Sequence, residues 1–273
     1  MSEAIVCETD DDGLSLVTFQ SEPVNAMTLA FWESLTTVLE KLIKDDNVKG
    51  IMFRSGLQKN VFTAGLSIEE LHVPATTPER MKKFWFTFSK VLITIYRCPK
   101  PTIALVNGAC PAGGCGLALC CDARVMTKDS AMGLNEVQIG IAVPHFWSKL
   151  MYSVFGPQYT ERALLTGKMH KVPELLEMKA VDCVVEHRDA LVGAGKKYWQ
   201  KVYMPLPAEA YQATKEDLRG TLADSWLSGL EMEFEAAKSF LSRPKTIENL
   251  GFVRQMLAAS GGRKKAPSSS SKM

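Results

Sequence analysis

The chain has 273 residues, of which 46% are apolar and 23% charged, and its formal net charge is +2. This balance is typical of a globular protein with one large domain, or one domain and a helical appendage. A chain of this length can bury a sizeable core without disulfides or metals. The near-neutral charge provides no strong field for nucleic acid or a membrane, and no stretch is long and apolar enough to span a bilayer.

Strand and helix patterns alternate along the first half of the chain. The strands that we expect are Leu14–Phe19, Val48–Arg54, Pro101–Asn107 and Asp122–Thr127. Helices are expected to begin near Thr28, at the capping-box spacing of Ser67 to Glu70, and at Thr77-Pro78, the last running to Tyr96. Alternation of this kind favours a mostly parallel sheet, and the short strands favour repeated strand–strand–helix units.

The second half is predicted to be mostly helical from Pro144 onward. One short run with a strand pattern, Ala180 to Glu186, interrupts it. The helices expected near the end are Ala208–Leu222, Trp226–Leu241 and Lys245–Ala259. The stretch from Ser260 is rich in glycine, lysine and serine, which predicts disorder.

The cysteines and histidines do not indicate a metal site. The seven cysteines are odd in number and lie mostly in apolar runs, so we expect buried thiols in a reducing compartment. The four histidines are scattered, and no cysteine pair has zinc-ligand spacing with histidines nearby. Neither a dinucleotide-binding nor a phosphate-loop glycine pattern is present.

Two glycine-containing turns each follow an expected strand and begin an expected helix. They are Phe62-Thr-Ala-Gly-Leu-Ser67 and Asn107-Gly-Ala-Cys-Pro-Ala-Gly-Gly-Cys-Gly116. Backbone N–H groups at a helix start lack intrahelical acceptors, and two of them aimed at one point form an oxyanion hole. Glycines in such turns also serve simply for tight turning or close packing, and spacing alone does not separate the two interpretations.

Glu136 interrupts an apolar run between Met132 and Gly140. A lone glutamate is most often a solvated surface residue. Its neighbours Leu134, Val137 and Ile139 are apolar, however, and favour a partly buried carboxylate. Desolvation would raise its pKa toward a value useful in a general base.

Taken together, these motifs resemble those of the crotonase (enoyl-CoA hydratase/isomerase) superfamily, from about Ile5 to about Leu250. The segments that carry the resemblance are Pro23-Val-Asn-Ala26, Phe62-Thr-Ala-Gly-Leu66, Asn107–Cys115, Cys121-Asp122 and Gly133-Leu-Asn-Glu-Val-Gln-Ile-Gly140. The resemblance implies an α/β crotonase (ClpP/crotonase-like) fold, in which repeated ββα units form a spiral with a C-terminal helical region. It divides the chain into a core of residues 1–200, a helical oligomerisation region of residues 201–259 and a tail of residues 260–273.

The resemblance also implies roles for individual residues. The N–H groups of Leu66 and Gly113 would hold a thioester oxygen, and Glu136 would be the catalytic acid/base. Asn135 would face the substrate. The remaining substrate-binding residues that it implies are Ala64, Gly65, Ser67 and Ile68 at the thioester and pantetheine end, and Asn25 and Ala26 near the adenine end.

Three departures from the family pattern narrow the reaction. Hydratases of the family carry a second glutamate where this chain has Gly116, and a glycine-rich loop where it has the bulky run Ile141 to Trp147. Both features resemble the mitochondrial-type delta3,delta2-enoyl-CoA isomerases. Ser67 stands where many relatives have aspartate, and serine still suits a helix start. A Gly116→Glu variant is expected to gain some hydratase activity unless Phe146 and Trp147 block water.

The resemblance therefore predicts an isomerase that converts 3-enoyl-CoA, cis or trans, to trans-2-enoyl-CoA in fatty acid β-oxidation. No cofactor is expected, because coenzyme A is part of the substrate. The alternatives are an enoyl-CoA hydratase, another crotonase-type reaction such as thioester hydrolysis, a non-catalytic acyl-CoA binder, or an RNA-binding relative. The expected partner is a second copy of the chain, in a homotrimer or a dimer of trimers, with no nucleic acid and no membrane.

The two ends of the chain bear on location. The acidic N-terminus lacks the features of a transit peptide. The last three residues, Ser271-Lys272-Met273, resemble the S-K-L peroxisomal address on a small polar stem. We expect a peroxisome or a peroxisome-like organelle such as a glycosome, reached through the import receptor, with the mitochondrion as second choice. A chance ending on a polar tail is the plainer interpretation of three residues.

Overall fold

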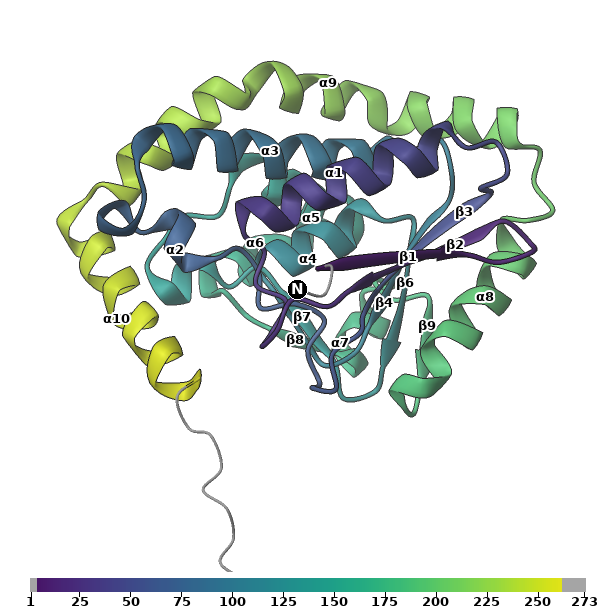
Figure 1. Cartoon of the computed structure of the whole chain (residues 1–273), viewed down its shortest axis with the longest axis horizontal. Coiled ribbons are helices and arrows are strands. Elements are labelled where there is room, and N and C mark those ends of the chain that lie inside the picture. The colour runs from purple at the N-terminus through teal and green to yellow at the C-terminus, as the bar shows by residue number, and fades with distance from the viewer. Residues whose placement is uncertain (1–3, 262–273) are drawn as a thin grey trace, which may run out of the picture.

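A six-stranded sheet organises the protein, and its computed structural model describes residues 4–261 (Figure 1). In sheet order its strands are β1 (Ile5–Thr9), β2 (Leu14–Phe19), β3 (Gly50–Ser55), β4 (Thr102–Val106), β6 (Ala123–Thr127) and β9 (Cys183–Val185). β1 pairs antiparallel with β2, and all other neighbours are parallel. The predicted parallel sheet is therefore confirmed, whereas β1 was not predicted.

A second, three-stranded sheet consists of β5 (Ala109–Pro111), β7 (Ala131–Gly133) and β8 (His170–Lys171). Isolated parallel bridges join Met27 to Leu66 and Val61 to Ala109 beside it. Along the chain, a strand of the large sheet is repeatedly followed by extended backbone in this small layer and then by a helix. These are the expected ββα units.

Helices cover both faces of the large sheet. α1 (Leu29–Lys44), α3 (Pro78–Tyr96) and α9 (Ala208–Leu241) lie side by side over one face, and α8 (Leu191–Val202) packs on the other (Figure 1). The shorter helices are α2 (Ile68–Leu71), α4 (Gly113–Cys120), α5 (His145–Phe155), α6 (Pro157–Thr166) and α7 (Val172–Glu177), and α10 (Pro244–Gly261) follows α9. Three 3₁₀ turns complete the described part of the chain: η1 (Val73–Ala75), η2 (Glu136–Ile139) and η3 (Arg188–Ala190).

The helix starts predicted from local sequence are confirmed where a side chain caps the helix. Thr28 Oγ1 accepts the N–H of Phe31, and Thr77 Oγ1 accepts that of Arg80, each at 3.2 Å. Within the described chain, Ser67 begins α2 without any such side-chain bond. The glutamate expected to complete its capping box, Glu70, instead accepts the N–H of Leu29 and pairs with Arg80.

The largest correction concerns the C-terminal helices. The two helices predicted at Ala208–Leu222 and Trp226–Leu241 are one continuous helix of 34 residues, α9. Its first half is attached to the core by a buried ion pair, in which Lys215 Nζ lies 2.8 Å from Asp122 Oδ2, and Arg219 lies 3.0 Å from the other carboxylate oxygen. This attachment fixes the direction of the helix, whose second half reaches the large pocket described below.

The remaining predictions for this half are mostly confirmed. The strand expected within Ala180 to Glu186 is the three-residue β9. α10 continues through the start of the predicted tail to Gly261, and residues 262–273, with their predicted disorder and targeting tripeptide, lie outside the described residues. No helix between residues 4 and 261 is long and apolar enough to cross a bilayer.

All seven cysteines carry free thiols. Cys98, Cys110, Cys115, Cys120 and Cys121 are buried, as expected, and Cys7 and Cys183 are half-buried. Burial raises the pKa of Cys121 to about 12, so its thiol stays protonated at neutral pH. These buried side chains act as small apolar residues of the core.

Candidate active site

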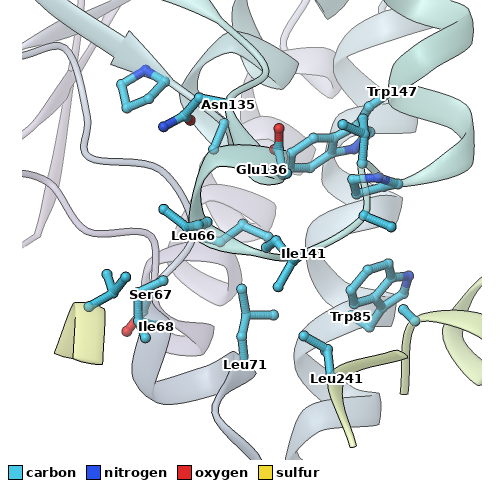
Figure 2. A pocket seen from close by; sticks show the side chains of 18 of the residues that line it. Leu66, Ser67, Ile68, Leu71, Trp85, Asn135, Glu136, Ile141, Trp147 and Leu241 are labelled. Carbon is cyan, nitrogen blue, oxygen red and sulfur yellow. The ribbon is translucent and has the colours of Figure 1, made fainter. Parts of the chain in front are cut away.

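A pocket of about 1070 Å³ lies between the small sheet and the C-terminal helices (Figure 2). One wall is built from the two glycine-containing turns and from η2 with the loop that follows it. The other wall comes from α9 and α10, through residues between Met232 and Leu257. The pocket therefore joins parts of the chain that are far apart in sequence, and most of its lining side chains are apolar.

Glu136 is the first residue of η2 and lies deep in this pocket. Its side chain is almost fully buried, with 2% of the residue exposed. Neither carboxylate oxygen accepts a hydrogen bond from the described residues. Burial, uncompensated by a cation, raises the pKa of Glu136 to about 7. A carboxyl group with such a pKa can both accept and return a proton near neutral pH.

The N–H groups of Leu66 and Gly113 approach one another beside the pocket. A methyl group built on Gly113 would lie 3.2 Å from the nitrogen of Leu66, and one built on Gly65 would lie 3.3 Å from the nitrogen of Gly113. Between residues 4 and 261, neither N–H donates a hydrogen bond to another backbone group. Two adjacent free donors, one of them at the start of α4, are suited to hold a developing negative charge.

The backbone around these donors adopts unusual conformations. Gly65 has φ +87°, a region in which side chains are disfavoured. Ala112, just before Gly113, has φ 47° although it carries a Cβ atom. Strain of this kind costs about 1–3 kcal/mol and is often found at functional sites. Sequence reasoning did not single out Ala112, because alanine gives no signal of a positive φ.

Most of the residues implied by the resemblance meet at this pocket. The lining includes Ala26, Ala64, Leu66, Ser67, Ile68, Asn135 and Glu136. Gly65 and Gly113 supply backbone beside it. Asn25 does not line it: its fully buried side chain accepts the N–H of Ser21 and donates to Ser55 Oγ and the carbonyl oxygen of Phe62. Asn25 therefore shapes the loop that places Ala26 at the pocket.

Gly116 faces the ring of Trp147. A Cβ atom at Gly116 would lie 3.3 Å from Cε2 of this indole, which is tight van der Waals contact. Trp147 is 1% exposed, lines the pocket, and has its ring edge-on to Phe88 at 5.8 Å between centroids. The space that a longer side chain at Gly116 would need is therefore filled by an aromatic wall.

A second buried carboxylate, Glu233 of α9, also lines the pocket and was missed by the sequence analysis. It is 6% exposed, and its oxygens accept the N–H of Phe146 at 3.2 Å and the indole N–H of Trp85 at 3.4 Å. Burial raises its pKa above the ordinary value for a glutamate. No local pattern distinguishes this glutamate from the solvated glutamates of the same helix.

Two cations also line the pocket. Lys59 Nζ donates to the carbonyl oxygen of Pro23 at 3.0 Å, and Arg254 of α10 pairs with Glu69 at 2.6 Å. Both are long, flexible side chains, so they can turn toward an anion in the pocket. Their charge was not recognisable as part of a site, because they come from segments nearly two hundred positions apart.

Comparison with known proteins agrees with the geometry. Residues 9–251 match the enoyl-CoA hydratase/isomerase family. The chain is 30% identical to enoyl-CoA delta isomerase 1, mitochondrial, of Mus musculus over 265 residues, which span 96% of this chain and 90% of the relative. The crystal structure of human mitochondrial delta3-delta2-enoyl-CoA isomerase superimposes with a TM-score of 0.90 at 28% identity, covering 95% of this chain and all (100%) of that one.

An enoyl-CoA hydratase of Bacillus halodurans shares the fold, with a TM-score of 0.82 at 22% identity, covering 92% of this chain and 100% of that one. The crotonase fold expected from the sequence is thus confirmed. From the match along most of its length and the likeness in structure, the chain belongs to the enoyl-CoA hydratase/isomerase family.

Proposed function

We propose that the protein is a delta3,delta2-enoyl-CoA isomerase, which moves the double bond of a 3-enoyl-CoA, cis or trans, to give trans-2-enoyl-CoA. One observation carries the proposal: of the three glutamates in the described pocket lining, Glu136 is the one whose oxygens accept no hydrogen bond. Glu69 pairs with Arg254, and Glu233 accepts two N–H groups. A single free carboxyl group is what a proton shuttle needs.

The reaction proceeds in two proton transfers. Glu136 removes a proton from C2, the C2–H electrons form the C1–C2 double bond of an enolate, and the thioester oxygen becomes negative. The N–H groups of Leu66 and Gly113 stabilise that oxygen, each by about 2.7–4 kcal/mol. The thioester carbonyl then re-forms, the C1–C2 π electrons become the C2–C3 double bond, and the C3–C4 π electrons take the proton back from Glu136 at C4. No water is consumed, and no cofactor beyond the substrate's own coenzyme A takes part.

The pocket also suits the rest of the substrate. The lining residues between Ala64 and Ile68 would contact the pantetheine, and Lys59 and Arg254 would supply cations for the phosphate groups of coenzyme A. The apolar side chains of α9 and α10 suit the acyl chain.

Comparison of two substrates tests the proposal. The purified protein is incubated with 3-hexenoyl-CoA and, separately, with crotonyl-CoA, and the products are followed spectroscopically. An isomerase forms the conjugated 2-enoyl thioester from the first and hydrates the second slowly. Equal or faster hydration of crotonyl-CoA identifies a hydratase, release of free coenzyme A identifies a thioesterase, and tight binding without turnover identifies an acyl-CoA binder.

We also propose that the protein is a homo-oligomer, a trimer or a dimer of trimers. Large apolar side chains on α9 and α10 support this: Leu218, Met232 and Phe252 are 77%, 71% and 63% exposed in the single chain. Sedimentation or light scattering of the pure protein measures the oligomeric state.

For location we propose a peroxisome-like organelle, on the basis of Ser271-Lys272-Met273. The mouse and human isomerases named above are mitochondrial, but that location describes those proteins.

A further inference from the structure

Glu233 lies at the meeting point of three helices and lines the same pocket as Glu136. It belongs to α9, accepts the indole N–H of Trp85 from α3, and accepts the backbone N–H of Phe146 in the first turn of α5. We propose that Glu233 is a positioning residue that holds Phe146 and Trp147 in place, so that water is kept from Glu136 while the proton moves from C2 to C4. This inference rests on the proposed isomerase function.

α9 contacts Phe146 at three points on one face. The Phe146 ring stacks on Trp226, with centroids 5.6 Å apart and planes at 15°. The same ring lies against Gly229, where a Cβ atom would come within 3.1 Å of it. One turn further along, Glu233 takes the Phe146 N–H. Side chain and backbone of this residue are therefore both located by α9.

The position of Phe146 determines that of the next residue, Trp147. The Trp147 ring fills the space in front of Gly116 and meets Phe88 edge-on. Phe88 in turn lies 5.0 Å from Trp85, the second donor to Glu233. The contacts form a closed circuit, from Glu233 through Phe146 and Trp147 to Phe88 and Trp85, and a change at Glu233 reaches Trp147 by two routes.

A buried carboxylate such as that of Glu233 destabilises the fold unless its oxygens accept hydrogen bonds. Glu233 forms no ion pair with any described residue, and the titratable group that acts on its charge is the exposed His145 at the start of α5. Its contribution is to satisfy two N–H groups that would otherwise be buried without acceptors, which is unfavourable. Ordinary apolar packing would not need these two oxygens.

The consequence concerns the fate of the abstracted proton. While Glu136 holds it, the proton is either returned to C4 of the same molecule or exchanged with water. A closed aromatic wall favours internal return, and a displaced Trp147 admits water. The ratio of internal return to exchange with water measures how well the aromatic side chains exclude water. This ratio does not depend on the amount of folded enzyme.

The experiment compares Glu233→Ala and Glu233→Gln with the wild type in heavy water. Gln keeps one acceptor oxygen and should restore part of what Ala loses. Gly229→Ala disturbs the packing of the Phe146 ring on the same face of α9 and leaves Glu233 intact, so it serves if the Glu233 variants fold poorly. Glu231→Gln is the matched control, because Glu231 lies on the same helix and pairs with Lys82 at an exposed position.

We expect Glu233→Ala and Gly229→Ala to incorporate more solvent deuterium at C4 than the wild type. We also expect kcat to fall about ten- to a hundredfold, because small misplacements near the reacting groups have effects of this size, while KM changes little. The Glu231 control should match the wild type. Folded variants whose deuterium incorporation equals that of the wild type, with or without a loss of kcat, overturn the inference. A wild type that does not isomerise 3-hexenoyl-CoA overturns the proposed function instead.

Discussion

The indole ring of Trp147 occupies the space into which a side chain at Gly116 would extend, with Cε2 only 3.3 Å from the position of a Cβ atom. Residue 116 therefore has no carboxylate, and the space that a carboxylate there would need is filled by Trp147. Substitution of this glycine alone does not recreate a hydratase site, because the wall that replaces the carboxylate remains.

Gly116→Glu should therefore destabilise the protein without creating efficient hydration. Forcing extra atoms against a packed ring costs about 1–3 kcal/mol, and the carboxylate would be buried beside Trp147. Urea unfolding measures the stability, and crotonyl-CoA hydration measures the gain. Gly116→Ala is the control, since a methyl group needs a shift of only a few tenths of an ångström. Vigorous hydration by a stable Gly116→Glu variant would mean that Trp147 moves aside easily.

Glu136→Gln should abolish most of the isomerisation while leaving substrate binding intact. Glutamine has nearly the same shape but cannot accept the proton, so we expect a loss of at least about a hundredfold in kcat, the scale of general-base catalysis. Calorimetric binding of a saturated acyl-CoA checks that the pocket is preserved. Glu40→Gln, at an exposed position of α1, is the control. Retention of more than about a tenth of the turnover would contradict a single-base mechanism.

The pH dependence of kcat/KM should report the ionisation of Glu136. Its pKa is raised by burial to about 7, and the ionised form accepts the C2 proton. Activity should consequently rise with pH, with a midpoint near 7, and level off above it. Rates of a slow substrate measured from acid to alkaline pH give the curve. A midpoint close to the ordinary glutamate value would show that the carboxyl group is hydrated in solution.

The same ionisation should affect stability in the opposite direction. In the unfolded chain the pKa of Glu136 is near 4.5, and in the folded chain it is about 7, so the folded chain holds this proton more tightly. The free energy of unfolding therefore falls as pH rises from about 4.5 to about 7. The full effect is about 3 kcal/mol. The Glu136→Gln variant lacks this dependence. The difference between its free energy of unfolding and that of the wild type should therefore shift in favour of the variant by about 3 kcal/mol between about pH 4.5 and 8. Urea unfolding at one fixed protein concentration measures the difference, and parallel curves would contradict it.

A fluorescent protein carrying the last dozen residues of the chain should become punctate and coincide with a peroxisomal marker. The receptor recognises the tripeptide at a free C-terminus, so deletion of Met273 should disperse the signal. A diffuse signal that does not change on deletion would leave the mitochondrion as the better proposal.

Local sequence signals predicted a helix start correctly where the capping side chain bonds to a residue only a few positions away. Thr28 and Thr77 cap helices through bonds to residues three positions later, so α1 and α3 begin where predicted. Glu70 shows the limit of such reasoning, because its partners are Leu29, 41 positions away, and Arg80. The sequence pattern could not distinguish a capping glutamate from one that ties two distant helices together.

The prediction broke α9 between Leu222 and Trp226, where the folded chain continues as one helix. Gly220 and Gly229 lie inside the two predicted halves, and glycine weakens a helix considered alone. In the folded chain the helix is stabilised by its neighbours: Asp122 binds its first half, and Phe146 packs directly on Gly229. Glu233 and the other pocket residues of this helix were missed, because its place in the fold could not be inferred.

The late position of α9 in the chain has a consequence for synthesis. Both oxyanion donors and Glu136 are made before residue 140, whereas the helix that seats the aromatic wall begins at Ala208. A nascent chain that folds from its N-terminal end would form the donors first and leave Glu136 open to water. Its carboxyl group would then have an ordinary proton affinity. On the proposed mechanism, Glu136 would therefore be a weak base in the growing polypeptide until α9 has been translated and has docked.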